Sequence, residues 1–163
     1  MKKINQEDYK KALKWIFNIL KKKKIKFNVL GGLAARAYGS KRMLVDIDLA
    51  MKDKDIKKVA KEIKDYVVES PHYSKSKNWI ACCFMKVKYS GITIEISGDK
   101  GDKMRNQKNK KWENLGDGLF KPSYKNVLGL RLPIIPKKKL IAYKLKLMRK
   151  VDIIDLKNLG YSK

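Results

Sequence analysis

From Gly31 to Leu49 the chain reads GGLAARAYGSKRMLVDIDL, and this stretch decides the fold. An alternating apolar segment, residues 25–30, comes directly before it and predicts a strand that stops at the pair of glycines. Residues 33–38 then predict a short helix, and residues 43–50 alternate again as a second strand. The order strand, glycine turn, helix, strand indicates a domain in which helices and strands interleave.

The segments outside this stretch predict further helices and strands. They are helices over 7–20 and over 56–67, the latter ending before Pro71, a β-hairpin over 79–97 with Ser90-Gly91 as its turn, and helices over 137–150 and 152–159. Together they predict an α/β (α+β) fold, a mixed β-sheet flanked by helices with C-terminal helices. The length of 163 residues suits a single domain over 1–163. We expect its core at about 25–97, a basic loop with little regular structure at 98–121, and a helical part at 133–163.

The composition excludes several classes of protein. Hydrophobic residues make up 44% of the chain, which is too many for a basic disordered tail. No apolar run approaches the roughly 20 residues of a membrane span, and the lysine-rich start lacks the apolar centre of a signal peptide. Cys82 and Cys83 are adjacent, without the spacing of a zinc site, and are expected to be reduced core residues. We therefore expect a cytoplasmic protein without a membrane partner.

The charge is strongly positive, since 41 Lys and Arg against 16 Asp and Glu give a formal net charge of +25. Only five of the basic residues are arginine, and an AT-rich genome would enrich lysine without any selection for binding. Such a bias does not explain the shortage of acidic residues. A field of this sign attracts polyanions, with nucleic acid first and an acidic membrane surface second. The charge thus favours a nucleic-acid partner over compositional drift.

Asp46 and Asp48 are the candidate metal ligands. On a strand both side chains point to one face, while the apolar residues around them point to the other. An isolated pair of this kind is usually a solvated face of an edge strand. Here a second strand, residues 92–97, has the same alternation and presents Glu95 on its polar face. If the two strands pair, the three carboxylates can hold two Mg²⁺ ions roughly 3.5 to 4 Å apart, the arrangement for nucleotidyl transfer.

Two further features suggest a site for phosphate. Gly31 and Gly32 end a strand and start a helix, where glycine lets backbone amides approach an anion. An ordinary tight turn is the alternative, and the aspartates on the next strand favour the phosphate site. Lys144 lies in the apolar stripe of its helix, so it either reaches out to solvent or pairs with an anion. We expect a nucleotide phosphate or one of the three acids as its partner.

These residues resemble the signature of the nucleotidyltransferase superfamily shared with DNA polymerase beta. That signature is Gly-Gly or Gly-Ser, a short helix, Asp-x-Asp, and a third acid on a later strand. The pattern is most similar to small members typified by abortive-infection toxins and lincosamide nucleotidyltransferases. The C-terminal run through Leu132-Pro133, Pro136, Lys144, Arg149, Asp152 and Asp155 is similar to the ending of those proteins. Leu44, where the toxin group usually has Ser or Thr, departs from the pattern, as does the second glycine where many members have serine.

The resemblance implies a Mg²⁺-dependent nucleotidyltransferase that uses an NTP and two Mg²⁺ ions. The residues carried over are Asp46 and Asp48 as Mg²⁺ ligands, Gly31 and Gly32 on the triphosphate, and Lys144 and Arg42 on phosphate. Glu95 would be the third acid, binding the catalytic ion and accepting the proton of the attacking hydroxyl. Some toxin-like members use a C-terminal aspartate instead, which keeps Asp152 as its rival. Asp152 could equally be only a helix cap.

The acceptor is predicted from the charge. A protein of charge +25 would repel a cationic antibiotic, so we expect an RNA end, tRNA-like, as the acceptor. A toxin-type enzyme with a cognate antitoxin or other protein partner would fit the resemblance. Two alternatives stay open: a small-molecule (antibiotic) nucleotidyltransferase, and a catalytically idle nucleic-acid-binding domain of the same fold.

Overall fold

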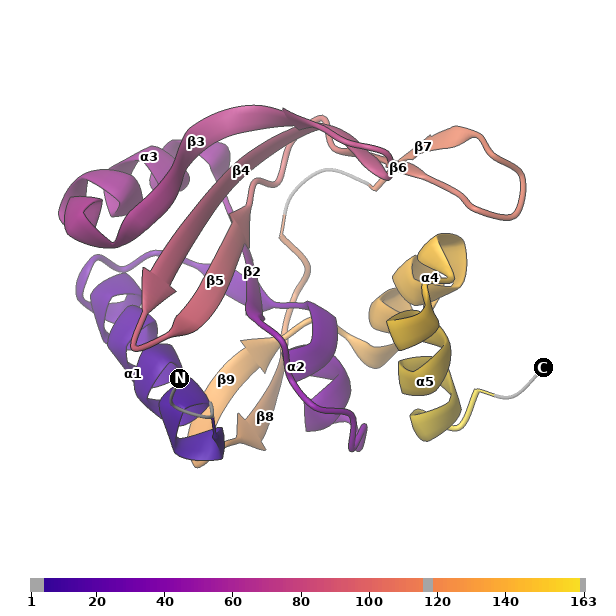
Figure 1. Cartoon of the computed structure of the whole chain (residues 1–163), viewed down its shortest axis with the longest axis horizontal. Helices are drawn as coiled ribbons and strands as arrows, with labels where there is room; N and C mark the ends of the chain where they lie inside the picture. Colours follow the sequence, from indigo (N-terminus) through magenta and orange to yellow (C-terminus); the bar gives the residue numbers. More distant parts are fainter. Residues whose placement is uncertain (1–4, 116–118, 162–163) are drawn as a thin grey trace.

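A mixed β-sheet forms the centre of the computed structural model, which describes residues 5–115 and 119–161 (Figure 1). Within these residues the strand order is β7-β6-β4-β5-β2-β1-β9-β8, and β3 pairs with β4 beside this path. The strands are β1 (Phe27–Val29), β2 (Ile47–Met51), β3 (Val67–Lys75), β4 (Trp79–Tyr89), β5 (Ile92–Ser97), β6 (Lys103–Arg105), β7 (Trp112–Asn114), β8 (Ser123–Val127) and β9 (Leu130–Ile134). The helices are α1 (Gln6–Lys22), α2 (Gly31–Ala37), α3 (Asp53–Glu62), a 3₁₀ turn (Lys64–Tyr66), α4 (Lys137–Leu147) and α5 (Lys150–Asn158). The predicted fold class is confirmed.

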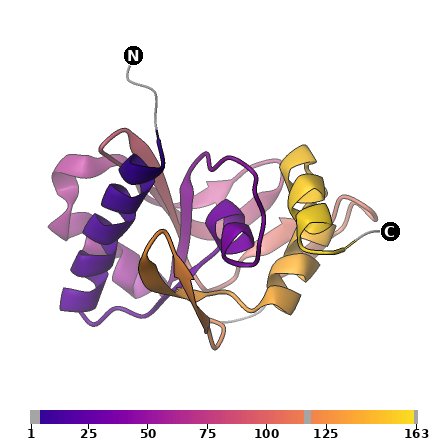
Figure 2. The same ribbon diagram turned by 90° about the horizontal axis from the view of Figure 1, so that it is seen from below.

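The helices lie at opposite ends of the molecule. In Figures 1 and 2, α1 and α3 lie at one end, α4 and α5 lie at the other, and α2 lies between them. Apolar residues of α1 and α3, such as Leu13 and Ile56, are buried in one cluster with the apolar side chains of β2 and β5. None of the helices in the described ranges has the length and apolar character that crossing a membrane would require.

The alternation of β2 and β5 separates the core from the opposite face of the sheet. Ile47 and Leu49 on β2, and Ile94 and Ile96 on β5, are at most 1% exposed. The residues between them are only partly buried and lie on the other face. Because side chains alternate along a strand, the buried isoleucines and leucine fix which way the acidic residues point.

Several elements differ from the sequence-based expectation. The strand predicted at 43–50 begins only at Ile47, and Met43 and Val45 before it are 79% and 69% exposed. The helix predicted over 56–67 is shorter, and β3 runs through Pro71. This strand is a sheet edge, where proline's missing N–H costs no ladder hydrogen bond. The segment 98–121 contains the β6–β7 hairpin rather than little regular structure, although 116–118 lie outside the described residues.

Candidate active site

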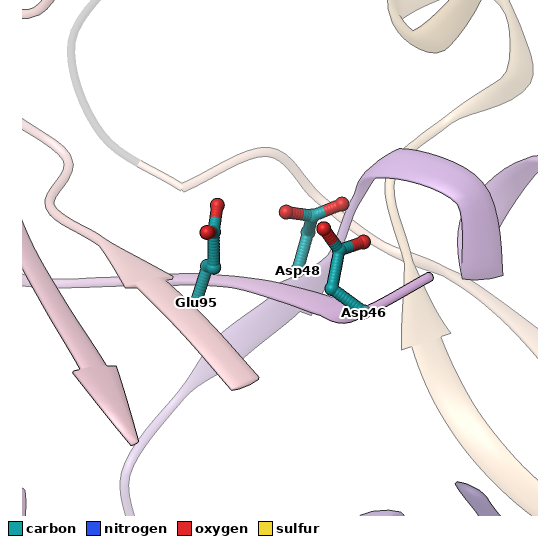
Figure 3. A group of neighbouring side chains, drawn as sticks. All are labelled: Asp46, Asp48 and Glu95. Carbon is teal, nitrogen blue, oxygen red and sulfur yellow. The ribbon is translucent and has the colours of Figure 1, made fainter. Parts of the chain in front are cut away.

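Three carboxylates converge on the polar face of the sheet. β2 and β5 are parallel neighbours, and their register places Asp48 opposite Glu95. Asp46 directly precedes β2. Carboxylate oxygens of these three residues, one from each, all lie within 4.8 Å of one another, and the three side chains point into the same space (Figure 3). The geometry predicted for Asp46, Asp48 and Glu95, called the acidic trio below, is therefore present.

The electrostatics of the acidic trio suit a divalent cation. Burial, together with the charges of Asp46 and Glu95, raises the pKa of Asp48 to about 7. Burial also raises the pKa of Asp46, partly opposed by Arg42. Carboxylates held this close repel one another, and carboxylate oxygens are the ligands that Mg²⁺ prefers in proteins. The donor set and its repulsion therefore fit a bound Mg²⁺.

The glycine turn is packed against the acidic trio. Gly31 has φ of +59°, and a Cβ built on it would overlap Asp48 Oδ2. The Leu30 N–H, just before this turn, donates to the Asp48 carbonyl oxygen at 2.9 Å. Gly32 similarly leaves room for the Arg42 guanidinium, which a Cβ would meet. Both glycines line the same cavity as the trio, whereas their contact with a triphosphate stays a prediction.

Lys144 is buried, as predicted, but its partners differ from those predicted. Its side chain is 1% exposed, and its Nζ lies 3.1 Å from Asp152 Oδ1 and 2.9 Å from Asp155 Oδ2. The expectation that one of the three acids of the sheet would pair with it was wrong, because α5 packs on α4 and places its own aspartates there. Its contact with a nucleotide phosphate stays a prediction.

Two arginines extend this ion pair into a network. Arg42 Nε and Nη2 donate to the two carboxylate oxygens of Asp155, each at 3.1 Å. Arg149 Nε lies 2.7 Å from Asp152 Oδ2. The basic network, defined as Arg42, Lys144 and Arg149 with Asp152 and Asp155, holds three positive and two negative charges. The three cations line the cavity that also contains the acidic trio, so a positive field faces the three carboxylates.

Asp152 has a different environment from the trio. It is fully buried, it accepts hydrogen bonds from Lys144 and Arg149, and it caps the start of α5 through the Arg149 N–H. Among the described residues, one group of acidic side chains has the spacing of metal ligands, and this group contains Glu95 but not Asp152. Glu95, and not Asp152, therefore lies beside Asp46 and Asp48, and its role as the third acid stays a prediction.

The cavity also contains residues to which the sequence analysis gave no part in the site. Its volume is about 740 Å³, and it extends from the acidic trio along β4. Lys86 of β4 lies opposite Glu95 in the antiparallel register, and its Nζ is 3.2 Å from Glu95 Oε1. Trp79 and Tyr143 line the cavity with their rings 6.0 Å apart. The alternation of β4 places Lys86, Phe84 and Cys82 on the polar face, a signal that the sequence did contain. Cys82 and Cys83 are buried and free, as expected.

Comparison with solved structures identifies the fold. A Thermotoga maritima protein, TM1012, provisionally described as a nucleotidyltransferase, superimposes with a TM-score of 0.72 at 21% identity, covering 94% of this chain and 93% of its own. The lincosamide antibiotic adenylyltransferase LnuA, in its lincomycin-bound structure, superimposes with a TM-score of 0.63 at 16% identity, covering 99% of this chain and 100% of its own. No protein-family model matches the chain, and no curated protein does. Over nearly its whole length, the chain has the nucleotidyltransferase fold.

Proposed function

We propose that the protein is a Mg²⁺-dependent nucleotidyltransferase that moves an NMP from an NTP to a hydroxyl group. The observation that carries this proposal is the acidic trio facing the basic network across one cavity. Nucleotidyl transfer needs carboxylates that hold Mg²⁺ at the reacting phosphate and cations that balance the charge of the departing pyrophosphate. The arrangement supplies both on one side of the sheet. The two structural matches support the same chemistry.

Each residue has a role in this proposal. Asp46 and Asp48 hold Mg²⁺, for which we propose two ions, and Glu95 shares the catalytic ion and accepts the proton of the attacking hydroxyl. When bound, Mg²⁺ would polarise the phosphate and stabilise the charge that develops in the transition state. Arg42 and Arg149 would face the triphosphate. The amides of Gly31 and Gly32 would approach its oxygens, since neither residue carries a Cβ.

Lys144 acts in this scheme through the basic network. Its contacts with Asp152 and Asp155 hold both carboxylates, which in turn orient Arg149 and Arg42. It also contributes positive charge near Asp48, whose pKa it lowers slightly against the stronger effects of burial and the neighbouring acids. Lys144 therefore organises the phosphate side of the cavity and lines it.

Two acceptors are proposed, and each is favoured by a different observation. The net charge of +25 favours an RNA end, and a toxin-type enzyme with an antitoxin partner remains part of that proposal. The cavity and the similarity to LnuA favour a small hydroxyl compound. Lysines occur on α1, α3 and α4 rather than on one element alone. Six of the 16 acidic residues line the cavity beside seven Lys and Arg, so the cavity is far less positive than the chain as a whole, which favours the small acceptor.

The experiment that tests the reaction is transfer of label from each α-labelled NTP, with Mg²⁺, to total RNA or to a panel of hydroxyl compounds. We expect transfer by the native chain and a loss of about 100-fold or more in Asp46→Asn and Glu95→Gln. Asp65→Asn, which removes an exposed carboxylate, is the matched control and should leave the rate unchanged. Absence of transfer from every NTP contradicts the enzyme proposal. Salt-sensitive RNA binding that survives Asp46→Ala, without transfer, would instead identify an idle binding domain.

A further inference from the structure

A second acidic region lies in the same cavity, away from the acidic trio. Asp99 and Asp102, called the distal acids below, follow the end of β5 and line the cavity together with Cys82, Phe84 and Trp79. Asp99 is four residues and Asp102 seven residues from Glu95 along the chain, so at about 3.3 Å per residue their backbones are at most about 13 Å and 23 Å from that of Glu95. All three line one cavity of about 740 Å³, which is the size of a site for a single small molecule.

Asp102 is a buried carboxylate with an unused acceptor atom. The residue is 8% exposed, and its Oδ1 is buried without a hydrogen-bond partner among the described residues. Buried polar atoms are paired in most native structures, and an unpaired carboxylate oxygen is especially costly. No ion pair to Asp99 or Asp102 is present in the described part of the chain, although 41 of the 163 residues in the full sequence are Lys or Arg. Asp102 Oδ1 therefore lacks the hydrogen-bond donor that a buried carboxylate oxygen normally has.

The neighbouring charges that shift the pKa of Asp102 most are negative. Burial raises the pKa of Asp102 to about 7; the Cys82 thiol opposes this rise, while the charges of Asp53 and Asp99 add to it. Two of the lysines that line the cavity already have acidic partners: Lys86 contacts Glu69 and Glu95, and Lys146 contacts Glu113. Lys75 and Lys139 also line it and form no ion pair within the described residues. A positively charged group beside Asp102 would favour the ionised carboxylate and lower its pKa.

The distal acids are held in place by the backbone. The Asp99 N–H donates to Asp53 Oδ1 at 3.0 Å, and the Asp53 N–H donates to Asp99 Oδ1 at 3.3 Å. Gly98, before Asp99, leaves the space that Asp53 fills, because a Cβ there would meet Asp53 Oδ1. The Asp102 carbonyl oxygen accepts from the Leu115 N–H at 3.1 Å. This part of the cavity is therefore preorganised.

We propose that the distal acids bind a protonated amine of the acceptor, so that the substrate class is a hydroxyl compound carrying an amino group. This inference rests on the proposed nucleotidyl transfer. An organic ammonium suits the site better than a metal ion, because within residues 5–115 and 119–161 only the acidic trio has metal-ligand spacing. The aromatic rings of Trp79 and Phe84 line the same cavity, and the Phe84 ring already has the Lys86 ammonium 5.6 Å from its centroid, which is the kind of contact that an alkylammonium group makes. This proposal differs from the expectation, drawn from net charge alone, that a cationic acceptor would be repelled.

The first test compares paired acceptors in the labelled-NTP assay. Each amino compound, such as kanamycin, lincomycin or chitobiose, is offered beside an uncharged counterpart that keeps its hydroxyl groups, N-acetylated for primary amines. We expect label on amino compounds, with kcat/KM lower by 10-fold or more for the uncharged forms. Asp102→Asn should lower kcat/KM for the amine by about 10-fold and leave the uncharged form unchanged. Glu62→Gln, which removes a surface charge paired with Lys23, is the control and should change neither. Equal use of the uncharged forms would overturn the proposal.

The second test needs no catalysis and separates this inference from the proposed function. Benzylammonium and its neutral counterpart benzyl alcohol are titrated into ¹⁵N-labelled protein, and the amide shifts of residues 98–102 are followed. We expect shifts with benzylammonium that Asp102→Asn removes and that benzyl alcohol does not produce. Equal responses to both probes, or no response to either, overturn the proposal even if nucleotidyl transfer is active. A selective response together with no transfer from any NTP would sink only the enzyme proposal.

Discussion

Gly31 leaves free the volume that the carboxylate of Asp48 occupies. A Cβ at position 31 would overlap Asp48 Oδ2, and the Leu30 N–H holds the Asp48 backbone at 2.9 Å. The glycine of the turn and the aspartate of the next strand are therefore one packing unit. The contact with Asp48 therefore explains why position 31 is a glycine, whether or not a nucleotide binds beside it.

The first prediction concerns Gly31→Ala. Gly31 has a positive φ of +59°, a conformation that costs an L-residue roughly 1–2 kcal/mol, and the added methyl group must also displace the Asp48 carboxylate. We expect loss of stability and a fall in nucleotidyl transfer of about 100-fold, measured by thermal denaturation and by the labelled-NTP assay. Gly91→Ala is the matched control, because its φ is +83° but open space surrounds its Cβ position. It should lower stability alone. Equal activity in the two variants would show that the contact with Asp48 is unimportant.

The acidic trio could be predicted because its signal is local. Alternation along residues 46–49 and 92–97 determines the faces of two strands, and in the observed register, with Ile47 opposite Ile94, Asp48 lies beside Glu95. The inward direction of Lys144 followed from its position in an apolar stripe for the same reason. Periodicity indicates which face a side chain occupies, which was enough for Lys144, whereas the acidic trio also required the assumption that the two strands pair.

The partners of Lys144 could not be predicted, because they depend on how two helices pack. Asp155 lies eleven positions further along the chain, and only the turn at Met148, with φ of +47°, brings α5 back against α4. The edge strands were missed for a related reason. Pro71 opposes a strand by propensity, and β3 forms because β4 offers a long edge for pairing. Contacts between elements distant in the sequence therefore determine both the partners of Lys144 and the formation of β3.

The second prediction concerns the pH dependence of stability without metal. The pKa of Asp48 is raised from 3.8 to about 7, so between these values the folded state holds a proton that the unfolded chain has released. The contribution of Asp48 to the free energy of unfolding is therefore largest below about pH 4, and it is lost as the pH rises to about 7. Asp48→Asn cannot ionise, so in EDTA it should stabilise the chain at pH 8 much more than at pH 5. Urea denaturation at both pH values measures this difference, and Asp65→Asn is the control. If Asp48→Asn raised the free energy of unfolding equally at both pH values, the raised pKa of Asp48 would be contradicted.

The third prediction concerns the interior of the basic network. Lys144→Met leaves Asp152 and Asp155, both fully buried, without their shared cation. Removing one partner of a buried ion pair costs about 3–5 kcal/mol, so we expect a loss of that order in the free energy of unfolding. Lys146→Met, two residues along the same helix, breaks a partly exposed pair with Glu113 and should cost at most about 1 kcal/mol. Urea denaturation of both variants decides the matter, and similar losses would refute the importance of the network.

The fourth prediction separates Glu95 from Asp152 as the third acid. Glu95 is about one-third exposed and belongs to the acidic trio, so Glu95→Gln should weaken Mn²⁺ binding, measured by calorimetry, by about 10-fold or more with little change in stability. Asp152 is buried among Lys144 and Arg149, so Asp152→Asn should destabilise the fold and leave Mn²⁺ affinity nearly unchanged. The opposite pattern, with metal affinity lost only in Asp152→Asn, would transfer the role of third acid to α5. Because each variant is the other's control, a general loss of folding cannot imitate a specific loss of metal binding.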